Sequence, residues 1–396
     1  MRATFPSEMF LSSEGAAFIS SGPLSAGVAV FSRGGAAVGE PRSESACHCS
    51  WVTERRRWHG TWRSARKQSE KCSLYALDTA TAGSWAELRP SASKTYAGEA
   101  RKFLAAKRAS IDAALSEAVV ASSAMNARLA DAMRYSLLAG GKRVRPALVL
   151  AACDMFGGVD EQAMPTAVAA EMVHTMSLIH DDLPAMDNDD FRRGRPTNHK
   201  VYGEDVAILA GDALLSEAFA HIAEKTPTSI VPPIRTLEVI RRLGNCVGLH
   251  GLAAGQALDL EAEGKPVDEI SLRTLETIHL YKTAALLRFC VTAGAILAGA
   301  ATDDLNRVES FANKIGLAFQ VADDVLDVTA STETLGKTAG KDIAAAKATF
   351  PRLLGLEESR KYAENLTKEA KGELTKYGDR AAVLLGLADF IIQRTN

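Results

Sequence analysis

Five aspartates lie within ten residues, from Asp181 to Asp190, directly after a segment with helical periodicity. The apolar stripe of that segment is Val168, Met172, Met176 and Ile179, so the first aspartates are expected at the C-terminal end of a helix. There the helix dipole is negative and neighbouring carboxylates repel one another. Hard divalent cations with oxygen ligands, Mg²⁺ foremost, relieve both effects; a solvated acidic loop is the alternative from this segment alone.

A second acidic cluster favours a metal-ion site over a solvated acidic loop. Its polar residues fall at positions i, i+3, i+4 and i+7 of an otherwise apolar segment: Gln320, Asp323, Asp324 and Asp327. This spacing predicts one polar stripe along a helix. Carboxylates on such a stripe are costly to bury unpaired, and two acidic helices that face each other can hold metal ions between them.

Basic residues accompany both clusters and indicate what the cations bind. They are Lys142, Arg143 and Arg145 in the box Gly140–Pro146, Arg192, Arg193 and Arg195, Lys282 beside Thr283, and Lys337, Lys341 and Lys347. His174 lies two turns before Asp181 on the same helix face. Each basic group alone is typical of a solvated surface, but together with the aspartates they predict a site for a diphosphate bound through Mg²⁺. The phosphate-binding pattern G-x-x-x-x-G-K-[ST] is absent, so a P-loop nucleotide site is not indicated.

The elements that position these residues are predicted to be helices. Segments rich in Ala, Leu, Glu and Lys begin near Tyr96 and carry apolar residues every three or four positions. We expect helices over 99–123, 126–139, 144–156, 162–183, 206–225, 230–262, 268–300, 304–328, 351–378 and 380–394. Residues 96–396 are therefore predicted to form a single large all-α helical bundle.

The first 95 residues have a different composition. They contain 16 Ser and all four Trp, with 12 Lys or Arg against 8 Asp or Glu, and show no sustained periodicity. Ser-rich, Arg-bearing and locally acid-poor sequence is typical of an organelle transit peptide, with a merely disordered leader as the alternative. We expect a plastid address, with the mitochondrion as the alternative.

Charge and hydropathy exclude other classes. The net charge of −2 gives no basic surface for nucleic acid. The strongest candidate for a transmembrane segment, 289–301, is shorter than the ~20 apolar residues that a membrane span needs.

From about Ala100 onward the sequence resembles the trans-prenyltransferases, or isoprenyl diphosphate synthases. The family's D-D-x-x-x-x-D and D-D-x-x-D motifs match Asp181, Asp182 and Asp187, and Asp323, Asp324 and Asp327. Its G-G-K-R-x-R-P and R-R-G boxes match Gly140–Pro146 and Arg192–Gly194. The two extra residues inside the first motif, and the run His174–His180 before it, resemble plastid and bacterial geranylgeranyl diphosphate synthases.

The resemblance implies a helical homodimer that joins isopentenyl diphosphate to dimethylallyl, geranyl or farnesyl diphosphate and supplies isoprenoid precursors, carotenoid precursors among them. It implies three Mg²⁺ ions per site, replaceable by Mn²⁺, with Asp181, Asp182, Asp187 and Asp323 as ligands and Asp324 and Asp327 in support. The allylic diphosphate is assigned to Arg192, Lys282, Lys337 and Lys347, with Thr283 and Gln320 beside the allylic carbocation. Isopentenyl diphosphate is assigned to Lys142, Arg145, His174 and Arg193.

The product is expected to depend on the turn before Asp181. Each isoprene unit adds about 5 Å, close to the ~5.4 Å pitch of a helix. Ser177 is small and Met176 is flexible, so a growing chain is expected to pass them and stop near Met172 and Val173, which gives a C20 product. The alternatives are a farnesyl diphosphate synthase, a non-catalytic regulatory subunit of a prenyltransferase, and a class I terpene cyclase.

Overall fold

The computed structural model describes residues 96–121, 123–266, 269–329 and 348–392. All of them belong to one compact unit, Leu77–Asn396. The predicted leader 1–95 and the predicted diphosphate ligands Lys337 and Lys347 lie outside the described residues. Within them the all-α prediction is confirmed, since the chain is helical apart from loops and one short hairpin.

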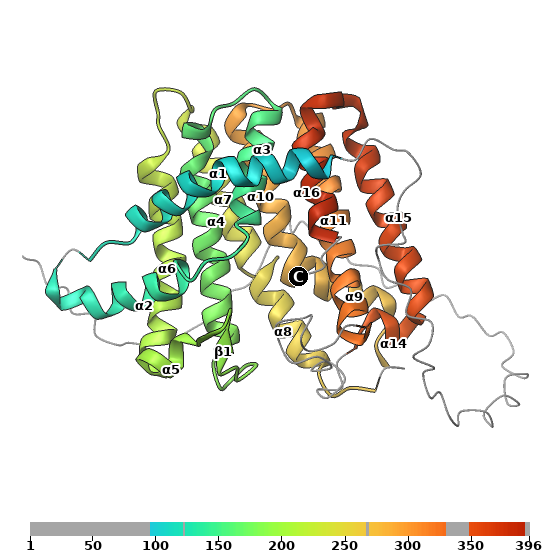
Figure 1. Ribbon diagram of the computed structural model, residues 1–396, viewed down its shortest axis with the longest axis horizontal. Coiled ribbons are helices and arrows are strands. Elements are labelled where there is room, and N and C mark those ends of the chain that lie inside the picture. The colour runs from blue at the N-terminus through green and yellow to red at the C-terminus, as the bar shows by residue number, and fades with distance from the viewer. Residues whose placement is uncertain (1–95, 122, 267–268, 330–347, 393–396) are drawn as a thin grey trace, which may run out of the picture. The chain divides into compact units, whose positions relative to one another are not determined.

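The longest helices have 22 to 28 residues, and the two acidic motifs lie toward the C-terminal ends of two of them (Figure 1). In chain order the elements are α1 (Ala97–Ala118), a 3₁₀ turn (Ala124–Asn126), α2 (Ala127–Leu137), α3 (Val144–Met155), α4 (Asp160–Asp181), β1 (Phe191–Arg192), β2 (Arg195–Pro196), α5 (Asn198–Tyr202), α6 (Glu204–Lys225), α7 (Pro233–Val247), α8 (Leu252–Ala262), α9 (Leu272–His279), a π-helical turn (Leu280–Ala284), α10 (Ala285–Ala298), α11 (Thr302–Thr329), α14 (Phe350–Leu354), α15 (Leu356–Leu374), a 3₁₀ segment (Thr375–Ala381) and α16 (Ala382–Ile392).

Helix α10 lies at the centre of the core. It contacts α3, α4, α7 and α11, and nearly every residue from Ala285 to Leu297 is buried. Gly294 allows a close approach of α10 to α3, because a Cβ atom there would lie 2.1 Å from the carbonyl oxygen of Val149. Each fully buried Leu or Phe in such a core contributes about 1.5–3 kcal/mol of hydrophobic stabilisation.

Two of the predicted helices are each divided in the structure. The single helix expected over 230–262 is wrong, because the chain breaks after Val247 and restarts at Leu252. A Cβ atom at Gly251 would lie 1.9 Å from the carbonyl oxygen of Cys246, so this tight turn requires glycine. The helix expected over 351–378 is likewise divided, at Gly355 with its φ of +84°. Apolar periodicity continues across both breaks and conceals them.

Two helices, α6 and the continuous run from α9 to α10, are long and apolar enough to span a membrane by length and composition. In the second, 72% of the most apolar window is buried inside the protein, as expected for a core helix; in α6 only 33% is buried.

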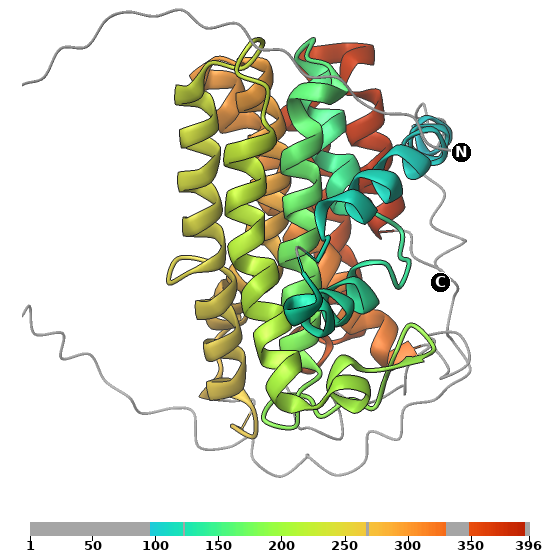
Figure 2. The ribbon, with the colours of Figure 1, turned by 90° about the vertical axis from the view of Figure 1, so that its left-hand side faces the viewer.

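The chain places both acidic motifs at one end of the helical unit. The hairpin β1–β2 that follows α4 lies at the lower end in Figure 1, together with α8, α9 and α14, whereas α1 crosses the long helices at the opposite end. The long helices α6 and α7 stand side by side in Figure 2 and are in contact.

Candidate active site

The first acidic motif begins where α4 ends. Asp181 is the last residue of the helix and Asp182 is its C-cap. The loop then folds back, since the Asp187 amide donates to the Asp181 carbonyl oxygen at 2.9 Å, and this leaves Asp187 exposed. Burial, opposed by Lys282 and reinforced by Asp187, raises the pKa of Asp181 to about 6. Burial therefore disfavours the charged form of Asp181, and a bound cation would favour it.

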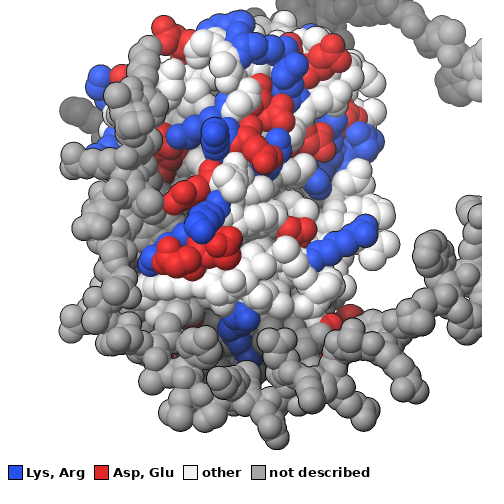
Figure 3. Space-filling model, turned by 90° about the vertical axis from the view of Figure 1, so that its right-hand side faces the viewer, with Lys and Arg blue, Asp and Glu red and all other residues white. Residues whose placement is uncertain are grey.

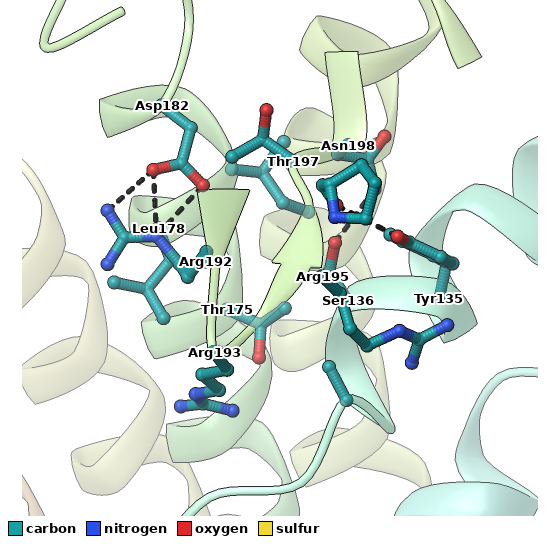
Figure 4. A pocket seen from close by; sticks show the side chains of 13 residues that line it. Tyr135, Ser136, Thr175, Leu178, Asp182, Arg192, Arg193, Arg195, Thr197 and Asn198 are labelled. Carbon is teal, nitrogen blue, oxygen red and sulfur yellow. Dashed lines mark hydrogen bonds and ion pairs between the residues drawn. The ribbon is translucent and has the colours of Figure 1, made fainter. Parts of the chain in front are cut away.

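Asp182 faces a different neighbour. Its buried carboxylate accepts from Arg192 Nε at 2.7 and 2.9 Å and lies 2.5 Å from Arg192 Nη2 (Figure 4). Burial raises the pKa of Asp182 in spite of this ion pair. Arg192, which the family resemblance assigned to the allylic diphosphate, is thus held by a carboxylate of the first motif.

The hairpin that carries Arg192 is fixed to α2. Its two-residue turn, Arg193 and Gly194, has φ values of +54° and +73°, the pattern of a type I′ turn. The Tyr135 hydroxyl donates to the Pro196 carbonyl at 2.8 Å, and the Asn198 amide donates to Ser136 Oγ at 2.8 Å. These contacts border a pocket between α2, α4 and the hairpin (Figure 4). Sequence reasoning missed Tyr135, Ser136 and Asn198, because no spacing signal connects them to the hairpin.

The glycine box lies against the tip of this hairpin. Gly140 and Gly141 have φ values of +86° and +128°, and Arg193 Nη1 donates to the Gly140 carbonyl. The φ of +128° at Gly141 is the conformation that requires glycine, and a Cβ atom there would lie 2.9 Å from Arg193 Nη1, the movable end of a long side chain. Arg143 follows with a φ of +51°, a conformation that costs about 1–3 kcal/mol for a residue with a side chain.

Three of the four predicted isopentenyl diphosphate ligands come together here. Burial and the charges of Arg145 and Arg193 hold the pKa of His174 well below its usual value, so the imidazole is neutral at pH 7. The ammonium group of Lys142, the fourth, lies 5.6 Å from the ring centroid of Phe390 on α16.

The second acidic motif lies near the end of α11, with Asp323 half-buried and Asp324 and Asp327 each 6% exposed. Asp324 Oδ2 accepts from the Phe350 amide at 2.9 Å and lies 3.9 Å from His279 Nε2. Burial lowers the pKa of His279 to about 4, so the ring is neutral beside this carboxylate. Asp327 Oδ2 is buried and accepts no hydrogen bond from the described part of the chain.

The π-helical turn links the two motifs. Lys282 Nζ lies 2.5 Å from Asp259 Oδ2 on α8, and the Thr283 hydroxyl donates to Gln320 Oε1 on α11. Lys282 is also the cation that most opposes the raised pKa of Asp181. A π-helical turn is rare and often occurs at functional sites. Sequence reasoning missed Asp259, whose only signal is its place one turn after Gly255 in α8.

The carboxylates fit a cation whose coordination shell is completed by the substrate. Among residues 96–121, 123–266, 269–329 and 348–392, no three His, Cys, Asp or Glu side chains gather closely enough to hold a metal ion by themselves. Mg²⁺ commonly keeps several waters and binds through one or two carboxylates plus substrate phosphates. The carboxylate oxygens of Asp181 and the unsatisfied Oδ2 of Asp327 are oxygen ligands of the kind that such an ion requires.

The predicted chain-length residues lie on the last turns of α4. Met172 and Val173 are completely buried, and Met176 is 5% exposed. Ser177 is half-buried, and its hydroxyl donates to the His174 carbonyl at 2.9 Å.

Comparisons with known proteins agree with this arrangement. Residues 126–383 match the sequence pattern of the polyprenyl synthetase family. The chain is 55% identical to the chloroplastic heterodimeric geranylgeranyl pyrophosphate synthase large subunit 1 of Arabidopsis thaliana, over 68% of this chain and 73% of that protein. It is 52% identical to the chloroplastic geranylgeranyl pyrophosphate synthase of Catharanthus roseus, over 75% and 82%.

The solved structures include an apo FPP/GFPP synthase from Zymomonas mobilis with a TM-score of 0.67 and 38% identity, over 75% of this chain and 99% of that one. The family pattern spans both acidic motifs and the glycine box, and the structural likeness covers the same helical unit. The chain belongs to the polyprenyl synthetase family.

Proposed function

We propose that this protein is a Mg²⁺-dependent prenyltransferase that makes geranylgeranyl diphosphate from isopentenyl diphosphate and an allylic diphosphate. One observation carries the proposal: the π-helical turn lies between the two acidic motifs, since the charge of Lys282 acts on Asp181 and the Thr283 hydroxyl donates a hydrogen bond to Gln320. This arrangement supplies carboxylates and a cation around one diphosphate. The relatives named as geranylgeranyl pyrophosphate synthases support the C20 product.

The proposed ligands form two groups, one for the allylic diphosphate and its Mg²⁺ ions and one for isopentenyl diphosphate. Asp181, Asp187 and Asp323 are the proposed metal ligands, and Mg²⁺ supplies positive charge against the departing diphosphate when it is bound. Lys282 and Arg192 hold the allylic diphosphate, while Lys142, Arg145, His174 and Arg193 hold the diphosphate of isopentenyl diphosphate.

The allylic carbon–oxygen bond breaks and its electron pair leaves with the diphosphate. The isopentenyl double bond then attacks the allylic carbon, and a proton passes from the new chain to the released diphosphate, which restores a double bond. Thr283 and Gln320 direct their dipoles toward the allylic cation, and apolar neighbours exclude water from it.

The test is to incubate the purified protein with labelled isopentenyl diphosphate, Mg²⁺ and each of the dimethylallyl, geranyl and farnesyl primers, and to separate the products by chain length. Geranylgeranyl diphosphate from all three primers is the expected result. Farnesyl diphosphate as the end product would reject the C20 assignment. Absence of any condensation product would favour the regulatory-subunit alternative, and a cyclised hydrocarbon would favour the terpene cyclase.

We also infer that the protein forms a homodimer through α6 and α7. Apolar side chains point outward from both helices, with Leu209 55%, Ile234 70% and Leu237 59% exposed. By contrast, the face shown in Figure 3 mixes basic and acidic side chains. Helix α15 itself carries the ion pairs Arg360–Glu357 and Lys361–Glu358.

Light scattering should give twice the chain mass for the wild type and for a Lys361→Glu control on α15. A Leu209→Glu, Leu237→Glu double variant should give the single mass. A wild-type monomer would exclude the homodimer and direct the search to a different subunit, as the name of the heterodimeric Arabidopsis relative suggests.

Residues 1–95 are proposed to be a plastid transit peptide that precedes the catalytic domain 96–396. The composition of this segment and the chloroplastic names of the relatives support the proposal. A fluorescent protein fused behind residues 1–95 should enter plastids, and the chain without them should keep full activity. Diffuse cytosolic fluorescence would refute the targeting role, whereas a mitochondrial signal would change the address.

A further inference from the structure

We propose that Arg143 and Glu171 are a positioning pair for the isopentenyl diphosphate end of the site. They do not bind the substrate themselves but fix the turn from which Lys142 and Arg145 extend. The inference rests on the proposed function, since it concerns the same diphosphate. It gives a role to the middle cation of the glycine box, which the substrate assignments leave unused.

The contacts of Arg143 make it a structural element and not a free ligand. Only 3% of the residue is exposed. Its Nη1 donates to Glu171 Oε1 at 2.8 Å, and its Nε donates to Asp112 Oδ1 at 2.8 Å. The guanidinium therefore ties the start of α3 to α4 on one side and to α1 on the other.

The backbone of Arg143 needs this support. Its φ of +51° lies in the left-handed region, which a residue with a Cβ atom rarely adopts. Such a conformation persists where the surroundings hold it in place. Val144, the next residue, begins α3, and the Ala147 amide donates to the Arg143 carbonyl at 3.1 Å, so this one residue sets the direction in which the helix leaves the loop.

The position of Glu171 connects the turn to the rest of the diphosphate end. Glu171 is 2% exposed and lies three residues before His174, on the same face of α4. Its negative charge also acts on Arg193, whose Nη1 holds the Gly140 carbonyl at the other end of the box. The Arg143–Glu171 pair thus sets the spacing of the box relative to His174 and Arg193.

The test compares Michaelis constants for the two substrates in Glu171→Gln and Arg143→Lys. Glutamine keeps the shape of Glu171 but loses its charge, and lysine presents a single nitrogen where Arg143 uses two. Since a misplacement of about 1 Å can cost ~100-fold, we expect the KM for isopentenyl diphosphate to rise about 10- to 100-fold in Glu171→Gln and by less in Arg143→Lys. The KM for the allylic primer and kcat at saturation should stay unchanged.

Arg108→Met is the matched control. Arg108 Nε also donates to Asp112, at 2.9 Å, but its side chain is 49% exposed and it contacts neither the box nor α4 in the described residues. This variant should leave both Michaelis constants unchanged.

Three outcomes would overturn the inference. One is a lower melting temperature in Glu171→Gln with both Michaelis constants unchanged, and another is an equal change in both. If Glu171→Gln does not fold, Asp112→Asn is measured instead, because Asp112 is the half-exposed partner of Arg143. An unchanged KM for isopentenyl diphosphate in Asp112→Asn is the third outcome. A wild type that uses no isopentenyl diphosphate would instead reject the proposed function.

Discussion

The two acidic motifs have similar sequences but different surroundings. At the end of α4, Asp182 is bound by Arg192 while its neighbour Asp181 carries charge that burial opposes. On α11, Asp324 accepts a hydrogen bond from the backbone amide of Phe350, so one carboxylate of that motif holds α14 against α11. Adjacent residues on a helix point about 100° apart, so the two members of an Asp-Asp pair meet different partners. The comparison shows that a motif of repeated aspartates combines ligands with structural supports.

The largest expected effect separates ligands from supports. Asp181→Ala and Asp323→Ala each remove a proposed metal ligand, and a loss of about 4 kcal/mol of transition-state stabilisation corresponds to roughly a thousandfold in kcat. Both variants should fold, since the change relieves carboxylate repulsion. Steady-state kinetics at saturating Mg²⁺ measures the loss. Near-normal turnover in Asp323→Ala would show that α11 contributes no ligand at this position.

The next largest effect concerns the residues one helical turn before each acidic motif, which are Met176 on α4 and Phe319 on α11. Met176→Tyr places a rigid ring in a buried position, and overpacking of about 1–3 kcal/mol corresponds to a change of roughly 5- to 150-fold in the ratio of products. The main product should shift from C20 toward C15, as measured by chromatography of the prenyl chains. Met176→Leu is the control, and an unchanged C20 product from the Tyr variant would place the chain-length limit elsewhere.

Asp324→Asn tests the structural half of the comparison. The variant keeps the shape of the side chain but weakens the acceptor that holds the Phe350 amide, and a lost charged hydrogen bond in a buried site costs about 1–3 kcal/mol. Thermal unfolding should show this loss, whereas Asp323→Asn should unfold close to the wild type. Equal melting temperatures for the two variants would mean that the Phe350 contact contributes nothing.

The raised pKa of Asp181 also predicts a pH dependence of stability. The folded-state pKa of Asp181 is about 6, above the unfolded value of 3.8. Between these two pH values the folded protein holds a proton on Asp181 that the unfolded chain has lost. In metal-free buffer the stability of the wild type relative to Asp181→Asn should therefore fall as pH rises toward 6, by about 1.4 kcal/mol per unit of pKa difference. Urea unfolding at pH 4.5 and pH 7 measures it. A constant difference would contradict the raised pKa.

Sequence patterns predicted the helices that carry the motifs because apolar periodicity is a local property. Asp181 and Asp323 could be placed on α4 and α11 in this way, although their roles as ligands remain predictions. The partners could not be found: Asp182 with Arg192, Lys282 with Asp259 and Arg143 with Glu171 are tertiary contacts without a spacing signal. The break before α8 was missed because only the packing around Gly251 requires it.

The close approach of α10 to α3 at Gly294 has a consequence for engineering. Glycine inside a helix is destabilising by roughly 0.5–1 kcal/mol relative to alanine, so helix glycines are natural targets for stabilisation. Gly294 is unsuitable, since a methyl group would collide with the Val149 carbonyl. Gly372 on α15 has nothing within 4 Å of its Cβ position, and Gly372→Ala should raise the melting temperature where Gly294→Ala lowers it. The glycines of the bundle thus divide into replaceable positions and positions where absence of a side chain is the structural requirement.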